Sequence, residues 1–515
     1  MKKQTSLWMC IALALAAAVA LAGCGKTTYF AGRNLPPSGL TNRVLIAIQN
    51  PSALSKGLLQ FVDAYYDIRS GYTDSPASFT ISGYQGALPI TIQNMPEEQI
   101  GAVYGSGDGS FDIITYSSEK LGGSISGLNG ASSSIFITRS QGYVFAASQS
   151  ANALTVVNQA AGGSYALSLP GVYRVSTNPG GSVAFAFVQN SNYIYYPVQL
   201  SAAQTLAYSG GTTTWPKAAV DCEPQSAPKW CLFQAQSPDH ADPLSLPGAP
   251  NSQAYAGLYY GAALTFDRPV KAVFSVDGGT AYILSCGPEC GGSAASVTPL
   301  PVAPMIFLLG QQSGLLPCNP SVSGCANKNT VPMNIIPVPG GASNALVDST
   351  TLYVVGQQYF ASSGLFGGNL TVLDLSQSPI AVSSPISISD GIPQGPSRIL
   401  LADDNTLWIA MTKCTNGVRA TFPALYPSGY GCLTMVNVSN PTSPSVTLLE
   451  PYLGDGTGIA AVTGLHKIYT AIGGQVYIYS TVDGSSIDNQ YVTVTGVAAD
   501  VAYMDGLSDS NNTVY

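Results

Sequence analysis

The residues with the clearest chemistry in this chain are its cysteines, because most of them fall in neighbouring pairs. Leaving aside Cys10 and Cys24, the sequence pairs Cys222 with Cys231, Cys286 with Cys290, Cys318 with Cys325, and Cys414 with Cys432. Close pairs in a chain that leaves the cytoplasm favour local disulfides. A zinc site is the alternative, but the sequence has only two histidines, His240 and His466, and no CxxC pair of the kind that binds zinc.

A second set of candidate residues is aromatic or polar and lies in two long stretches, 201–262 and the segment between Cys414 and Cys432. The candidates for ligand contact are Trp215, Trp230, His240, Asp242, Tyr426 and Tyr430. Exposed aromatic side chains can stack on sugars or anchor a protein partner. The alternatives are that Trp215 and Trp230 cover a small core of their own, and that His240 lies in a solvated loop and binds no metal beside Asp242.

Sequence motifs for catalysis are scarce. There is no CxxCH for haem, no GxxxxGK[ST], no HExxH and no GxSxG. The glycine-rich stretches 105–110 and 122–127 follow apolar runs but open no helix, so we interpret them as turns. We expect His466 to be exposed in a hairpin turn. No residue is therefore predicted to be catalytic, and no cofactor or metal is predicted.

The first 24 residues predict export and attachment of a lipid. Two lysines precede an apolar run that ends near Leu21, and the sequence LAGC ends at Cys24. This arrangement resembles the lipobox of bacterial lipoproteins, which implies cleavage after residue 23 and acylation of Cys24, with palmitate among the lipids expected. Gly25 follows, which favours the outer membrane over the inner one. The alternatives are an ordinary signal peptide or a short membrane anchor, although about 15 apolar residues are fewer than the roughly 20 that span a bilayer.

The composition excludes some partners. Only 9% of the residues are charged, compared with about 25% in typical proteins, and the formal net charge is −8. A lysine-poor, acidic chain is a poor candidate for binding nucleic acid, and it offers no basic patch for anionic lipid. We expect a monomer that contacts the membrane only through the lipid on Cys24.

The rest of the chain is dominated by a repeat of short apolar runs that are rich in β-branched and aromatic residues. The run that is easiest to align occurs eight times, at 43–48, 100–105, 143–148, 183–188, 281–286, 352–356, 407–412 and 467–472. Most copies follow a turn rich in Gly, Asp, Asn or Ser, and a further apolar run lies on either side. A fourth run is visible in several units, and the units are about 40 residues apart where no insertion intervenes.

Four short antiparallel strands per unit are typical of a β-propeller. We therefore predict an all-β fold with a single propeller of eight blades, or seven if the run at 100–105 is not a true copy. The aligned run is the second strand, which is apolar on both faces because it packs between neighbouring blades. The turn before it requires positive φ, which Gly, Asn and Asp adopt readily.

The two ends of the repeat region complement each other. The segment 497–506 has the pattern of a first strand and its turn, whereas the region begins at 43–48 with a second strand. The two ends should therefore share one blade and close the ring. The predicted organisation is a signal peptide at 1–23, a tether at 24–41, the propeller at 42–508 with an insertion at 201–262, and a tail at 509–515.

The runs LYVVG and KIYTAI, with the strands NLTVLDLS and CLTMVNVS that follow such runs, resemble the YVTN-type β-propeller repeats of bacteria. The resemblance implies a propeller outside the cytoplasm and supplies no catalytic residue. Long loops on such a scaffold commonly bind ligands, and we expect at least two disulfides to brace the loops of one face.

We therefore expect a lipid-anchored binding or scaffold protein of the cell envelope, with a protein or glycan partner. A metal-dependent, lactonase-like hydrolase that uses acidic and amide side chains in the propeller channel is the alternative. A purely structural surface protein is a third possibility.

Overall fold

The computed structural model is built almost entirely of β-strands. It describes residues 32–50, 56–68, 79–200, 219–224, 228–235, 264–302, 334–362, 364–391, 395, 397–413, 432–450, 454–487, 492 and 494–507. The short 3-10 helices η2 (Gly287–Cys290) and η4 (Asp403–Asn405) interrupt the strands. Within the described ranges, no helix has the length and apolar character needed to cross a bilayer.

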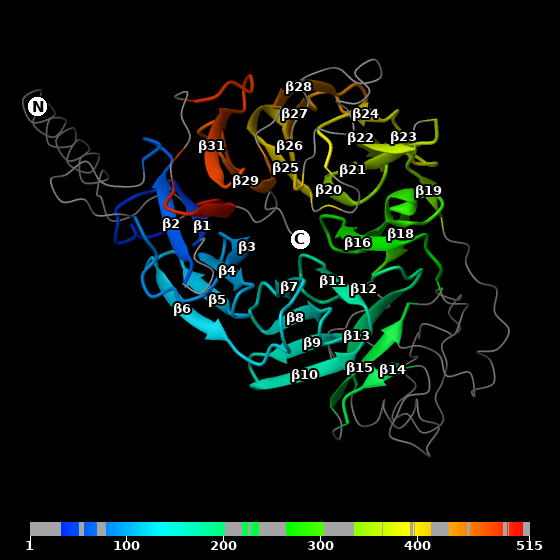
Figure 1. Ribbon diagram of the computed structural model, residues 1–515, viewed down its shortest axis with the longest axis horizontal. Coiled ribbons are helices and arrows are strands. Elements are labelled where there is room, and N and C mark those ends of the chain that lie inside the picture. Colours follow the sequence, from blue (N-terminus) through cyan, green and yellow to red (C-terminus); the bar gives the residue numbers. More distant parts are fainter. Residues whose placement is uncertain are drawn as a thin grey trace, which may run out of the picture.

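Eight separate antiparallel sheets are arranged around a central axis, which makes the fold an eight-bladed β-propeller (Figure 1). The first four blades, each given from its innermost strand outward, are β32 (Val497–Tyr503), β1 (Arg43–Gln49) and β2 (Leu58–Asp63); β3 (Pro89–Met95), β4 (Ile100–Gly105), β5 (Phe111–Thr115) and β6 (Lys120–Ile125); β7 (Ser134–Ile137), β8 (Tyr143–Ser148), β9 (Ala153–Asn158) and β10 (Gly163–Ser168); and β11 (Val172–Thr177), β12 (Ala184–Val188), β13 (Ile194–Leu200), β15 (Lys229–Gln234) and β14 (Ala219–Cys222).

Blades five to eight follow the same order from the axis outward. They are β16 (Pro269–Phe274), β17 (Thr280–Ser285), β18 (Ser296–Pro301) and β19 (Ile336–Pro337); β20 (Asn344–Asp348), β21 (Thr351–Phe360), β22 (Leu365–Asp374), β23 (Ala381–Val382) and β24 (Ile386–Ser387); β25 (Ser397–Ala402), β26 (Thr406–Met411), β27 (Leu433–Asn437) and β28 (Ser445–Glu450); and β29 (Gly456–Val462), β30 (Lys467–Ile472) and β31 (Gln475–Ser480). The run at 100–105 is the strand β4, so the predicted count of eight is confirmed.

The ring is closed by the two ends of the chain, as predicted. The late strand β32 pairs antiparallel with the early strand β1, with Leu45 opposite Ala502. The backbone N–H of Met504 also donates to the carbonyl of Arg43 at 2.9 Å. One blade therefore contains strands from both ends of the sequence.

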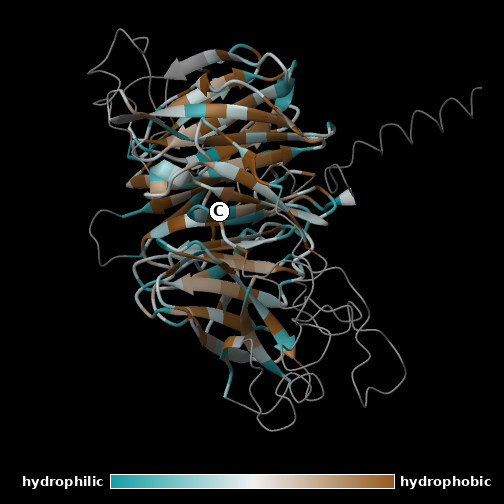
Figure 2. Ribbon diagram, turned by 90° about the vertical axis from the view of Figure 1, so that its right-hand side faces the viewer, coloured by the Kyte–Doolittle hydropathy of each residue, from teal (hydrophilic) through white to brown (hydrophobic). Residues whose placement is uncertain are grey.

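The hydrophobic core is divided into eight clusters, and each cluster lies between two adjacent blades. The second strands supply much of each cluster because both of their faces are covered, and every residue of β4 and β26 is buried. Viewed edge-on, apolar strands fill the interior of the stacked blades (Figure 2). This arrangement explains why the second strand is the easiest run to recognise in the sequence.

The turns between the first and second strands adopt positive φ, as the repeat pattern predicts. Gly278 and Asn405 fit the expected residue types, with φ of 70° and 52°. In three other blades the residue is Gln99, Gln141 or Ser349. The backbone conformation therefore recurs more regularly than the sequence that encodes it.

The stretch 201–262, predicted as an insertion, contributes two strands to its blade. β15 is hydrogen-bonded to β13 as the fourth strand, and β14 adds a fifth strand at the outer edge. Within the described residues of the insertion, 219–222 and 229–234 are therefore strands of the blade.

Two of the four predicted disulfides are present between described residues. Cys222 and Cys231 join β14 to β15 as directly opposed partners, with a Cα–Cα distance of 4.1 Å. Cys286 and Cys290 close the turn that contains η2. The first bridge lies within a sheet, whereas the second braces the loop after a second strand.

The other two predicted disulfides involve cysteines outside the described residues. Cys432 is disulfide-bonded, but its predicted partner Cys414 is not described. The predicted bridge between Cys318 and Cys325 is not among the disulfides of the described structure, because Cys318 and Cys325 both lie outside the described ranges. The pairing of Cys318 with Cys325 therefore stays a prediction.

Two cysteine sites share the face on which second and third strands are joined. Cys286 follows the second strand β17, and Cys432 immediately precedes the third strand β27. The expectation that disulfides brace loops of one face therefore agrees with the positions of these two cysteines.

The described N-terminal segment runs across the opposite face, where the innermost strands end. The guanidinium of Arg33 donates to the carbonyls of Pro96, Asp505 and Gly506 at 2.8–3.3 Å. Arg43, which is fully buried, forms ion pairs with Asp505 at 2.6 Å and with Glu119 at 2.9 Å. These contacts fix the start of the propeller against its last strand and against the second blade.

Candidate functional site

A cavity of about 450 Å³ lies at the axis of the propeller. All eight innermost strands contribute lining residues from the first half of the strand or from the residue just before it. Examples are Thr91 of β3, Arg174 of β11 and Arg398 of β25. This volume is in the usual range for small-molecule sites, and a cavity of this kind is the default candidate for a binding site.

The cavity opens on the face where the innermost strands begin. Its rim includes the exposed residues Ser133, Gln189 and Asn190, which belong to loops. Cys290, whose disulfide closes the turn of η2, also lines the cavity. The N-terminal segment and its Arg33 contacts lie at the other end of the same strands.

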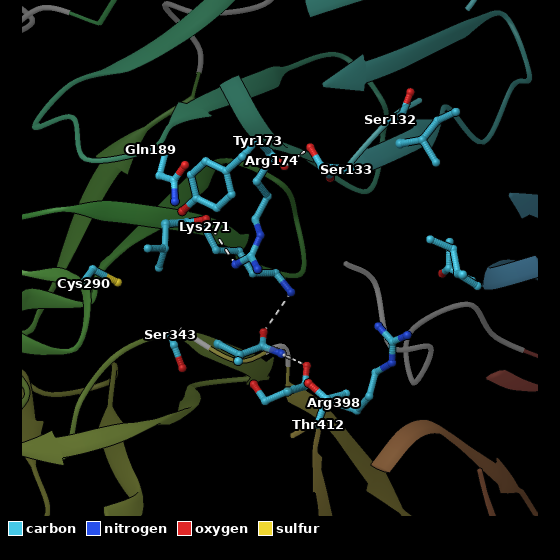
Figure 3. A pocket seen from close by; sticks show the side chains of 18 of the residues that line it. Ser132, Ser133, Tyr173, Arg174, Gln189, Lys271, Cys290, Ser343, Arg398 and Thr412 are labelled. Carbon is cyan, nitrogen blue, oxygen red and sulfur yellow. Dashed lines mark hydrogen bonds between the residues drawn. The ribbon is translucent and has the colours of Figure 1, made fainter. Parts of the chain in front are cut away.

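Four basic residues line the cavity, namely Arg268 and three that lie on innermost strands of separate blades, whose side chains Figure 3 labels. Arg174 lies on β11, Lys271 on β16 and Arg398 on β25. Lys271 and Arg398 are 6% and 7% exposed. Such burial is unusual for these residue types, which are almost never fully buried unless they are paired. In a chain with a net charge of −8, this local excess of basic groups is the main electrostatic feature of the axis.

Hydrogen bonds connect each of these side chains to the next blade. Arg174 donates to the Val270 carbonyl at 3.3 Å, and the Lys271 Nζ donates to the Asn344 Oδ1 at 2.8 Å. The guanidinium of Arg398 donates from Nε to the Thr457 carbonyl at 2.7 Å. Each bond connects one blade to the next, so the positions of the basic groups are set by the ring itself.

One carboxylate, Asp500 of β32, accompanies the basic groups. Its Oδ2 lies 3.7 Å from a terminal guanidinium nitrogen of Arg398 and accepts a hydrogen bond from the backbone N–H of Ile92 at 2.8 Å. Burial raises the pKa of Asp500 to about 6, although Arg398 and the backbone donors oppose the shift. Asp500 therefore loses its charge within a physiological pH range.

Burial also disfavours the charged forms of the basic groups. It is the largest cause of the lowered pKa of Lys271, which falls well below its usual value, and the nearby Arg174 and Arg398 lower it further. Burial reduces the pKa of Arg398 to about 10, partly offset by Asp500. Arg398 is consequently still a cation at neutral pH, whereas the surroundings of Lys271 disfavour its ammonium form.

Of the six ligand contacts predicted from the sequence, Trp230 is the one that the structure describes, and it does not line this cavity. Trp230 is fully buried and packs edge-on against Tyr143 and Phe145 of the preceding blade, with ring centroids 5.7 and 6.2 Å apart. Its predicted role as an exposed ligand contact is therefore wrong, because it fills the core between two blades. Trp215, His240, Asp242, Tyr426 and Tyr430 lie outside the described residues, as does Cys24, the predicted site of lipid attachment.

His466 lies in a turn between β29 and β30, as predicted, and is exposed. Its Nδ1 lies 2.8 Å from the Asp404 carboxylate of the preceding blade, and this contact raises the pKa of His466. This pair is on the face away from the mouth of the cavity.

The charged residues at and beside the cavity share a pattern in the sequence. Arg174, Lys271, Arg398 and Asp500 each interrupt an apolar first strand, in VYRVST, PVKAVF, SRILLA and VAADVAY. A charge inside an apolar strand is notable in a chain with so few charges. Second strands are the most conspicuous apolar runs of the repeat, so these charges in first strands are easily overlooked.

No protein-family model matches the chain. No curated protein matches it in sequence. The lipoprotein assignment and the YVTN-type repeat therefore stay predictions.

Several solved structures are similar to the chain in fold. Hydrazine synthase from Kuenenia stuttgartiensis is 12% identical, with 80% of this chain and 100% of that chain covered and a TM-score of 0.42. A periplasmic gluconolactonase from Pseudomonas aeruginosa is 12% identical, with 90% and 98% covered and a TM-score of 0.40. The Cps50 (Swd1) β-propeller domain from Myceliophteria thermophila is 9% identical, with 76% and 97% covered and a TM-score of 0.39. At these identities the likeness concerns the fold alone.

Proposed function

We propose that this protein is an exported binding propeller whose axial cavity receives a small ligand that carries a carboxylate or phosphate group. The observation that supports this proposal is the convergence of Arg174, Lys271 and Arg398 in one cavity of an otherwise acidic protein. Guanidinium groups match the planar, two-oxygen geometry of such anions. The lipid predicted on Cys24 would keep the binding site at the cell envelope.

The same chemistry covers two sources of ligand, a free organic acid and the acidic sugar of a glycan. The ring of Tyr173 supports either source, because it lines the cavity with the Arg174 guanidinium 5.6 Å from its centroid. Neighbouring Ser134 and Asn344 supply further polar groups. We therefore restrict the expected partner, a protein or a glycan, to a ligand that carries a negative charge.

The charge of the cavity favours this function over the metal-dependent hydrolase. A divalent cation in such a channel requires several oxygen ligands, mainly carboxylates. Among the described residues, no group of three or more His, Cys, Asp or Glu side chains is placed to hold a metal. The acidic side chain found at the axis, Asp500, already lies beside Arg398.

Calorimetric titration of the purified full-length protein in detergent tests the proposal. Citrate, phosphate and glucuronate serve as ligands, glucose serves as the neutral control, and a low and a high salt concentration are compared. We expect the anions to bind more weakly at high salt and glucose not to bind. Glucuronate binding tighter than citrate would indicate the glycan source, and the reverse would indicate a free acid.

Matched variants connect the binding to the cavity. Arg174→Gln should weaken anion binding at least about tenfold, because a hydrogen bond to a charged group contributes roughly 1.5–3 kcal/mol. Arg139→Gln removes an exposed arginine that pairs with Glu97 and Glu98 outside the cavity, and should leave binding unchanged. An absence of anion binding, or equal effects of both variants, would overturn the proposal.

A further inference from the structure

Lys271 is placed in the cavity as an amine with a fixed orientation. It is the third residue of β16, and its side chain reaches across to the neighbouring blade, where Nζ donates to the Asn344 Oδ1 at 2.8 Å (Figure 3). Asn344 is itself fixed, because its Nδ2 donates to the Ser397 carbonyl at 2.8 Å and its Oδ1 accepts from the Ala345 N–H at 2.9 Å. Three successive blades therefore position the lysine nitrogen.

The surroundings of this amine favour its neutral form. Arg174 from β11 and Arg398 from β25 flank the same cavity, and Asp500 from β32 lies beside Arg398. Burial and the two guanidinium groups lower the pKa of Lys271 well below its usual value. A neutral lysine amine in a site with other cations is a recognised arrangement for nucleophilic attack on carbonyl compounds.

We propose that Lys271 forms a reversible imine with aldehydes or ketones that carry a carboxylate or phosphate group. This inference rests on the proposed function, since the guanidinium groups of Arg174 and Arg398 must hold the anionic part of the compound. Asn344 accepts one N–H of the amine and so orients the nitrogen, whose lone pair in the neutral form attacks the carbonyl carbon. The cavity, the amine and the anion-binding groups together define the class of ligand, which consists of oxo acids and phosphorylated aldehydes.

The reaction is balanced without an oxidant or reductant. The lone pair of the Lys271 Nζ bonds to the carbonyl carbon and gives a carbinolamine. The two N–H protons pass to the carbonyl oxygen, the C–O bond breaks, and the oxygen leaves as water while the C=N bond forms. Hydrolysis reverses these steps, so the ligand can be released unchanged.

The test uses pyridoxal 5′-phosphate as a lysine-directed probe, with pyridoxal, which lacks the phosphate, as its matched control. Each probe is added to the full-length protein in detergent, the imine is reduced with borohydride, and labelled peptides are identified by mass spectrometry. We expect the phosphorylated probe to label Lys271 at least tenfold faster than it labels the exposed Lys56 and Lys120. Citrate should protect Lys271, and pyridoxal should label it poorly.

Two variants separate imine formation from simple attraction of charge. Lys271→Arg replaces the amine with a guanidinium group that cannot form an imine, so labelling at this site should vanish. Lys467→Arg alters a lysine that pairs with Asp67 outside the cavity, and should leave the labelling of Lys271 unchanged. The pH profile adds a further readout, because labelling of Lys271 should remain fast at pH 7, where ordinary lysines are protonated.

The outcomes separate this inference from the proposed function. If citrate binds but Lys271 is labelled no faster than Lys56, or labelling rises only near pH 10, the imine proposal is wrong and the anion site stands. If neither citrate binding nor labelling of Lys271 occurs, both are wrong. Equal labelling by both probes would show that the anionic group does not direct the reaction.

Discussion

Asp500 adjusts the charge of the cavity with pH. Its pKa of about 6 means that the carboxylate is ionised above pH 6 and neutral below it. The ionised form offsets the charge of Arg398 and repels an incoming anion. Anion binding should therefore take up protons, and affinity should rise as the pH falls.

We predict that sulfate, whose own charge is constant over this range, binds more tightly as the pH falls from 8 to 5. The Asp500→Asn variant should bind sulfate about fivefold more tightly at pH 7.5, equivalent to about 1 kcal/mol, and should show a flatter profile. Calorimetry over the pH series measures both quantities. A wild-type profile without slope would contradict the assignment of Asp500.

Trp230 stands out in the sequence as a candidate for ligand contact, but the sequence does not reveal that its side chain is buried between two blades. We predict that Trp230→Ala lowers the free energy of unfolding by about 3–5 kcal/mol, as for other large core truncations, in urea unfolding experiments. Tyr193→Ala, at a position 38% exposed, is the control and should change it by less than about 1 kcal/mol. Comparable effects of the two variants would mean that the core between these blades tolerates the void left by the missing Trp230 side chain.

At the scale of single residues, the sequence alone is a poor guide to which side chains are buried and which ones meet. The burial of Trp230 depends on its pairing in β15 against the preceding blade, and no local pattern encodes that contact. Likewise, Arg174, Lys271 and Arg398 are distant in sequence, and only the ring brings them together. The side chains that face the axis are selected by strand register, which the repeat alignment does not specify.

The element scale was more predictable, because the second strands have apolar residues on both faces and are therefore conspicuous. The fourth strand of the blade with Cys222 and Cys231 was missed, since β15 follows a long intervening stretch. The predicted pairing of the cysteines nevertheless held where the structure describes both partners. Short sequence separation limits which cysteines can meet, so a pairing can be predicted even where the strand cannot.

The two described disulfides should act differently. The double variant Cys222→Ala/Cys231→Ala should lower the free energy of unfolding by roughly 2–3 kcal/mol, because the loop it opens is short, and should leave anion binding unchanged. Cys286→Ala/Cys290→Ala should weaken anion binding, because Cys290 lines the cavity. Each variant is the control for the other in unfolding and titration experiments. A binding defect in the first variant alone would contradict this division.

At the scale of the whole molecule, eight inter-blade cores and one shared blade explain the closed ring. The closure could be predicted from the sequence because the repeat region begins with a second strand that lacks its first. The region ends with a first strand that lacks its second. The buried ion pairs of Arg43 with Asp505 and Glu119 were not foreseeable, since they depend on the closed ring itself.

We predict that Arg43→Met lowers the free energy of unfolding by about 3–5 kcal/mol, because it leaves buried carboxylates without their cation. Arg139→Met, which removes an exposed arginine that also contacts two glutamates, should change it by less than about 1 kcal/mol. Urea unfolding of both variants measures the difference. Similar values would show that the Arg43 ion pairs do not secure the closure.

The contacts of Arg33 determine how the molecule would stand on a membrane. Arg33 follows Cys24 by only nine positions, and such a stretch spans about 30 Å at most when fully extended. With a lipid on Cys24 as predicted, the face that carries Arg33 would be held close to the bilayer. The mouth of the cavity would then look outward into the aqueous space, where dissolved acids arrive by diffusion.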